Sequence, residues 1–112
     1  MLTALWGWLV AFFFTQLFEM PIYWAATRSL RVAFLASAMT HPIVWFVFPL
    51  SMEHGLSYGW MVVFAELFAV TAEAAWLMFN GMKRGPALLW SLGANTFSAT
   101  LGFVLRALVG FP

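Results

Sequence analysis

The sequence predicts an all-α integral membrane protein that folds as one bundle of four transmembrane helices in an up-down-up-down order. Hydrophobic residues make up 64% of the 112 residues and charged residues only 8%, whereas soluble domains have about 45–50% apolar and about 25% charged residues. The chain also contains four apolar runs of about the 20 residues that a helix needs to cross a bilayer. Because the links between these runs are short, neighbouring spans are expected to be antiparallel, and the whole chain is expected to form a single domain.

The four spans are expected at about residues 2–26, 32–50, 59–82 and 87–109. The first begins directly with apolar residues and lacks a basic stretch and a clear cleavage site, so it is interpreted as a retained span and not as a signal peptide. The stretches that separate the runs, "TRSLR", "SMEHGLSYG" and "KRGP", combine turn-forming and charged residues, which is typical of loops.

The basic residues predict the orientation of this multi-pass bundle. The loops at 27–31 and 83–86 each contain two basic residues, and the middle loop contains no Lys or Arg. Since Lys and Arg are concentrated in cytoplasmic loops, the first and third loops are expected in the cytoplasm. The N- and C-termini and the middle loop are then expected outside.

The composition also restricts the cofactors and partners. Cysteine is absent, which excludes disulfides, thiolate metal sites and iron–sulfur clusters. The net charge of +1 is too small to indicate a nucleic-acid partner. The expected partners are the lipid bilayer and a second membrane-embedded chain, either another copy in a homodimer or a different membrane protein, because four short helices enclose little space alone.

Each span contributes one hydrogen-bonding or titratable side chain at a similar depth. With a helical rise of about 1.5 Å per residue, Glu19 lies roughly 12 Å, Asn95 roughly 13 Å, and His41 and Glu73 roughly 15 Å from the expected cytoplasmic ends. A carboxylate or imidazole that faced lipid would cost several kcal/mol. We therefore expect these four side chains to point into the bundle and to meet there.

Further residues near this level are expected to support it. Three are polar residues within about one helical turn of the four side chains. Two are prolines that follow Glu19 and His41, and each should leave a backbone carbonyl of the preceding turn without its helical hydrogen bond. The supporting residues are Gln16, Ser37, Ser98, Pro21 and Pro42.

Glu66 and Arg106 are the remaining charges within the third and fourth spans. They lie about a turn apart in depth, so an interhelical ion pair with a structural role is one expectation. The other is that Arg106 extends to the outer interface, as long basic side chains do near helix ends.

The favoured interpretation of the polar level is a site for a proton or a metal cation. Glu19, His41, Glu73 and Asn95 offer nitrogen and oxygen ligands, which suit a divalent metal such as Zn, Fe or Mn. Without a metal, two close carboxylates would interact strongly and could relay protons. Either chemistry would suit a cation-coupled transporter.

Two alternatives remain open. In the first, the protein is an intramembrane hydrolase in which Glu73 is the general base and His41 and Asn95 stabilise an oxyanion. In the second, it is a non-catalytic accessory or assembly subunit, and the polar level only holds the helices together. Transport is favoured over enzymatic activity, and no motif supports a family assignment.

Overall fold

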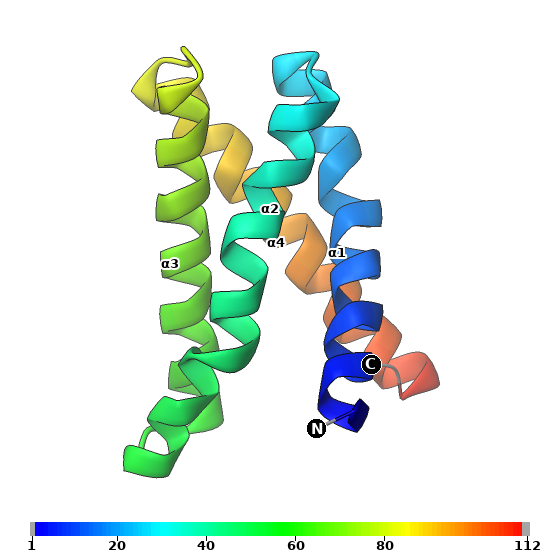
Figure 1. Cartoon of the computed structure of the whole chain (residues 1–112). Helices are drawn as coiled ribbons and strands as arrows, with labels where there is room; N and C mark the ends of the chain where they lie inside the picture. The colour runs from blue at the N-terminus through cyan, green and yellow to red at the C-terminus, as the bar shows by residue number, and fades with distance from the viewer. Residues whose placement is uncertain (1, 111–112) are drawn as a thin grey trace.

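The computed structural model of the chain describes residues 2–110 and is helical almost throughout (Figure 1). Four segments are long and apolar enough to cross a membrane, the second of them with its short 3₁₀ helix included. The prediction of an all-helical bundle is therefore confirmed. The elements are α1 (Leu2–Thr27), α2 (Leu30–Phe46), the 3₁₀ helix η1 (Phe48–His54), α3 (Tyr58–Phe79) and α4 (Arg84–Val109).

The helix boundaries differ from the expected spans where the backbone chemistry requires it. Helix α2 ends at Phe46, before the expected residue 50, and η1 follows with Pro49 in its first turn. Proline has no N–H and cannot continue the hydrogen bonding of an α-helix. Helix α3 ends at Phe79, because Asn80 caps it and Gly81 adopts a positive φ of 99°, which glycine allows without steric cost. Pro42 lies within α2 and does not interrupt it.

The elements define two ends of the bundle. In Figure 1, α1 begins and α4 ends at the same end as η1, which we call the terminal end. The two short connections, α1–α2 and α3–α4, lie at the opposite end, and we call this the basic end because Arg28 and Lys83 lie in them. Helix α1 packs against α2 and α4, and α3 packs against the same two helices.

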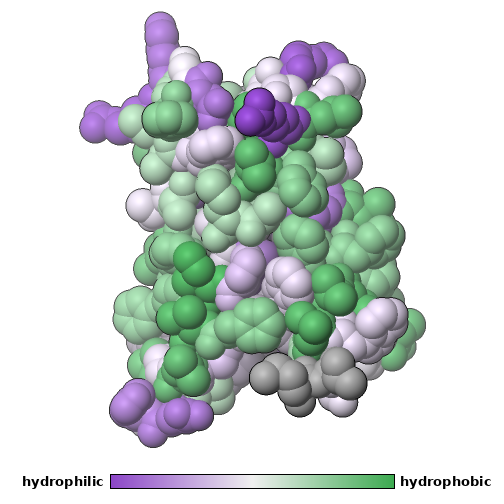
Figure 2. Space-filling view, in the orientation of Figure 1, coloured by the Kyte–Doolittle hydropathy of each residue, from purple (hydrophilic) through white to green (hydrophobic). Residues whose placement is uncertain are grey.

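The surface is suited to lipid. Figure 2 shows a broad belt of hydrophobic residues between hydrophilic patches at the two ends of the molecule. Large apolar side chains such as Phe13, Leu67 and Leu89 are more than half exposed along the helices. In water such a surface would be costly, whereas in a bilayer it is the expected exterior.

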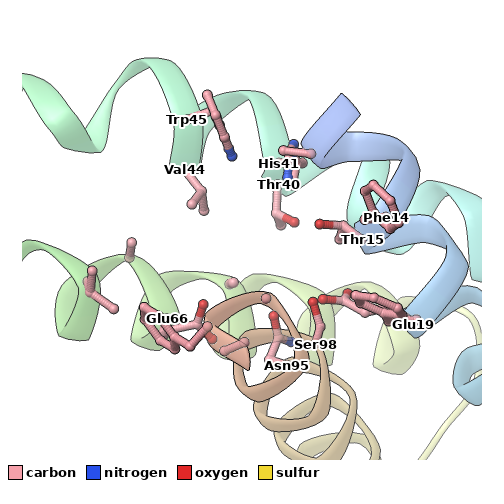
Figure 3. Close-up of a pocket in the computed structure, with 18 of the residues that line it drawn as sticks. Phe14, Thr15, Glu19, Thr40, His41, Val44, Trp45, Glu66, Asn95 and Ser98 are labelled. Atoms are coloured by element: carbon pink, nitrogen blue, oxygen red, sulfur yellow. The ribbon is translucent and has the colours of Figure 1, made fainter. Parts of the chain in front are cut away.

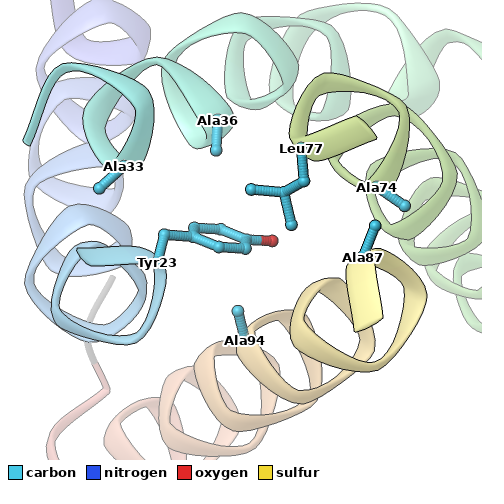
Figure 4. Close-up of a cluster of buried hydrophobic side chains, with 7 residues drawn as sticks. All are labelled: Tyr23, Ala33, Ala36, Ala74, Leu77, Ala87 and Ala94. Atoms are coloured by element: carbon cyan, nitrogen blue, oxygen red, sulfur yellow. The ribbon is translucent and has the colours of Figure 1, made fainter. Parts of the chain in front are cut away.

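A tightly packed core fills the basic half of the bundle. It surrounds the fully buried Tyr23, which extends from α1 into the centre (Figure 4). Most of its other members are alanines, and small side chains let helix backbones approach closely in membrane proteins. The core consists of Tyr23, Ala33, Ala36, Ala74, Leu77, Ala87 and Ala94.

A pair of neighbouring alanines tests this packing. Ala74 is 2% exposed, whereas Ala75 faces outward. We expect Ala74→Leu to lower the free energy of unfolding by about 1–3 kcal/mol, because extra atoms in a filled core force the helices apart. Ala75→Leu should leave it unchanged. The measurement is equilibrium unfolding in mixed detergent micelles, and equal losses in the two variants would contradict the packing described here.

Candidate functional site

Glu73 is the centre of the polar network. Its carboxylate is 2% exposed and accepts hydrogen bonds from side chains on all three other helices. Tyr23 of α1 donates to Oε1 at 2.5 Å, Thr40 of α2 donates to Oε2 at 2.6 Å, and Asn95 of α4 donates to Oε1 at 3.0 Å. Hydrogen bonds to a charged acceptor are short and strong, so the four helices are joined at one carboxylate.

Glu19 forms the second buried carboxyl group. It is 3% exposed, and Ser37 donates to its Oε1 at 2.8 Å. Ser98 of α4 also lies beside Glu19, and Figure 3 shows the two side chains pointing toward each other. The Glu19 carboxyl lies near that of Glu73, and the two groups interact electrostatically. We call Glu19 and Glu73 the carboxyl pair.

Asn95 is held in place by its own helix and by α3. Its Nδ2 also donates to the carbonyl of Ser91 at 2.9 Å, and the Ser91 hydroxyl donates to the carbonyl of Val70 at 2.7 Å. These bonds fix the rotation of α4 against α3. The amide therefore reaches Glu73 without needing to reorient.

A cavity of about 550 Å³ extends from the carboxyl pair toward the terminal end (Figure 3). Its outer part is lined by the exposed side chains of Tyr58 and Arg106. Its walls are partly aromatic, with Phe18 from α1, Trp45 from α2 and Phe103 from α4. In the opposite direction the alanine core fills the bundle. The carboxyl pair thus lies at the closed inner end of a cavity.

His41 is buried as expected, but it does not meet the carboxyl pair. Its imidazole lies among the rings of Phe12, Trp45 and Trp8, with centroid distances of 5.5, 6.2 and 6.3 Å. Its Nδ1 has no hydrogen-bond partner among the described residues. It therefore makes no hydrogen bond to the backbone carbonyl that Pro42 was expected to leave free. The preceding residue, Thr40, reaches Glu73 instead. The reason is geometric, because consecutive residues of a helix point in directions about 100° apart.

The expected metal ligands are therefore not assembled. Glu19, Glu73 and Asn95 come together, but His41 lies outside this group. Within residues 2–110, no three His, Cys, Asp or Glu residues are arranged to hold a metal ion. Of the residues named for the hydrolase alternative, Asn95 contacts Glu73, whereas His41 lies among aromatic rings.

The predicted ion pair between Glu66 and Arg106 is not formed in the described part of the chain. Arg106 donates to the Tyr58 hydroxyl at 3.3 Å and lies 6.0 Å from the centre of its ring. Tyr58 begins α3 at the terminal end. Arg106 therefore extends toward that end, which is the direction expected if it reaches an interface and does not pair with Glu66. Glu66 is half-buried and lines the cavity.

The other supporting residues are divided between the site and its surroundings. Ser37 and Ser98 contact Glu19, as described above. Gln16 donates to the carbonyl of Phe34 at 3.1 Å and joins α1 to α2 away from the carboxyl pair. Pro21 is exposed within a continuous α1.

Two residues of the network were not predicted, Tyr23 and Thr40. Each carried a signal, because Tyr23 lies four residues after Glu19 and Thr40 lies three residues after Ser37. Residues at these spacings share one face of a helix. Their hydroxyl groups can donate to a buried carboxylate, so the polar face could have been extended to include them.

No protein-family model, no curated protein and no solved structure matches this chain. The chemistry of the site follows from its own groups. Two neighbouring buried carboxylates repel each other strongly when both are ionised. Within residues 2–110, no Lys or Arg forms an ion pair with either of them. The arrangement can therefore hold a proton or another cation between the two carboxyl groups.

The Tyr23 hydroxyl can be removed without changing the size of the side chain. We expect Tyr23→Phe to lower the free energy of unfolding by about 1–2 kcal/mol, because Glu73 loses its shortest hydrogen bond in a water-poor interior. Tyr58→Phe is the matched control, since Tyr58 is exposed, and it should change the value by less than about 0.5 kcal/mol. Unfolding in mixed micelles measures both. Equal values for the two variants would show that the bond to Glu73 contributes nothing.

Thr40 and His41 offer a second comparison of neighbours. His41→Phe is expected to keep the free energy of unfolding within about 0.5 kcal/mol of wild type, because it retains the aromatic contacts and removes a buried nitrogen without a partner. Thr40→Val should cost about 1–2 kcal/mol through the lost bond to Glu73. The same unfolding assay applies. A larger loss for His41→Phe than for Thr40→Val would contradict the assigned contacts.

Proposed function

We propose that the protein is a multi-pass membrane protein in which the carboxyl pair binds and releases a proton in exchange for another cation, as the coupling site of a small carrier. The observation that carries this proposal is the proximity of two buried carboxyl groups at the inner end of a cavity. Neither has a basic partner among the described residues. A proton or a cation must then occupy the pair.

The hydrogen bonds indicate where the proton resides. Glu73 accepts three bonds from Tyr23, Thr40 and Asn95, which stabilise it as a carboxylate. Glu19 contacts two serine hydroxyls, and a hydroxyl can donate or accept. We therefore assign the proton to Glu19, and Glu73 beside it remains a carboxylate. A cation that enters the cavity can take its place.

The topology gives this exchange a direction. In a membrane, the four helices would alternate in an up-down-up-down order, and the positive-inside rule would place the basic end in the cytoplasm. The cavity would then open outside, and the alanine core would separate the carboxyl pair from the cytoplasm. Transport would require this core to open in a second conformation, and a second copy or another membrane protein would complete the bundle around the cavity.

The proton on the carboxyl pair can be detected by infrared spectroscopy in lipid at neutral pH. We expect wild type to show the carbonyl stretch of a buried protonated carboxyl group, and Glu19→Gln to lose it. Glu53→Gln is the control, since Glu53 is exposed on η1, and its band should be unchanged. The proposal is wrong if wild type shows no band from a protonated carboxyl group. It is also wrong if the band persists in both Glu19→Gln and Glu73→Gln. The polar level would then be structural, as in an accessory subunit.

A further inference from the structure

We infer that the cavity binds an organic monocation with an apolar body, and that its positive group lies beside the carboxyl pair. This inference rests on the proposed function, because it names the cation that replaces the proton. It excludes a bare metal ion as the main ligand, and three features of the cavity support it.

The first feature is size. A cavity of about 550 Å³ lies within the range of small-molecule sites, about 300–1,000 Å³. A single desolvated metal ion would occupy a small part of it and would need several ligands at short distances. The described residues offer no such group. A molecule with a ring or a branched body would fill the space.

The second feature is the aromatic wall. Phe18, Trp45 and Phe103 line the cavity from three different helices. Aromatic rings attract cations through their electron-rich faces and pack against apolar groups. A proton or a small hydrated ion would use neither property, whereas an organic cation would use both.

The third feature is the balance of charge along the cavity. Glu66 lines its middle, and Glu19 and Glu73 lie at its inner end. Arg106 is the basic residue among those that line it, and it is bound to Tyr58 at the outer part. Arg106 is eleven residues from Asn95, which is roughly 16 Å along the helix. Its charge therefore does not neutralise the inner end.

The charge requirement is tested with three probes of nearly equal size. Phenyltrimethylammonium is the cation, tert-butylbenzene is its neutral isostere, and benzenesulfonate is an anion with the same ring. Binding to the purified full-length protein in uncharged detergent is measured by isothermal titration calorimetry, with a detergent blank. We expect the cation to bind at least tenfold more tightly than the other two. Titrations in buffers of different ionisation enthalpy should show the release of about one proton for each cation bound.

Four variants locate the bound cation. Glu19→Gln and Glu73→Gln should each weaken cation binding tenfold or more, and Glu19→Gln serves alone if the loss of the Glu73 carboxylate prevents folding. Trp45→Leu should weaken it about threefold, which is the effect of one cation–π contact. Glu53→Gln should have no effect. Cation affinity that is unchanged in both Glu19→Gln and Trp45→Leu would overturn the inference.

The outcome also separates this inference from the proposed function. If the three probes bind equally, or if the anion binds best, the inference fails. The infrared band of the protonated carboxyl pair would then still support proton binding. If that band is missing from wild type, the proposed function fails, whatever the probes do.

Discussion

The whole structure depends on the burial of one carboxylate. Glu73 cannot remain in the centre of the bundle unless its oxygens are satisfied, because an unpaired buried charge costs far more than a hydrogen bond contributes. Tyr23, Thr40 and Asn95 satisfy it from three different helices. Each bond sets the rotation of one helix about its axis. In a bilayer the surrounding lipid would exert little such control, because it would be as apolar as the helix surfaces that face it.

The two halves of the bundle divide packing and chemistry between them. Toward the basic end, alanines bring the helices together around Tyr23 (Figure 4). Toward the terminal end, side chains larger than alanine surround a cavity, and Pro49 in the first turn of η1 also lines it. Tyr23 belongs to both halves, since its ring is part of the core and its hydroxyl is part of the network. The closed end of the cavity is thus built from the residues that stabilise the fold.

The inner end of the cavity holds two carboxyl groups, Glu19 and Glu73, where solvent could hardly screen the repulsion between them if both were ionised. A structural network alone would need one buried carboxylate with its donors, and Glu73 already has three. Glu19 adds a second carboxyl group close to the first, which raises the cost of the site unless a proton or a cation is bound. Such a cost at one point, within a fold that is consistent elsewhere, is typical of a functional site. The proposed exchange of cations at the carboxyl pair would account for this cost.

The sequence by itself determined the all-helical class, the number of long apolar helices and most of their bounds, because length and apolar composition are properties of each segment alone. It also identified Glu19, Glu73 and Asn95 as buried, since lipid excludes such groups from the surface. Tertiary structure decided which neighbours they meet. The depth of a residue follows from the number of residues that separate it from the end of the helix. The direction in which its side chain points changes by about 100° with each residue. A shift of one position therefore gave Thr40 the place predicted for His41, and only the packing of all four helices fixes that rotation.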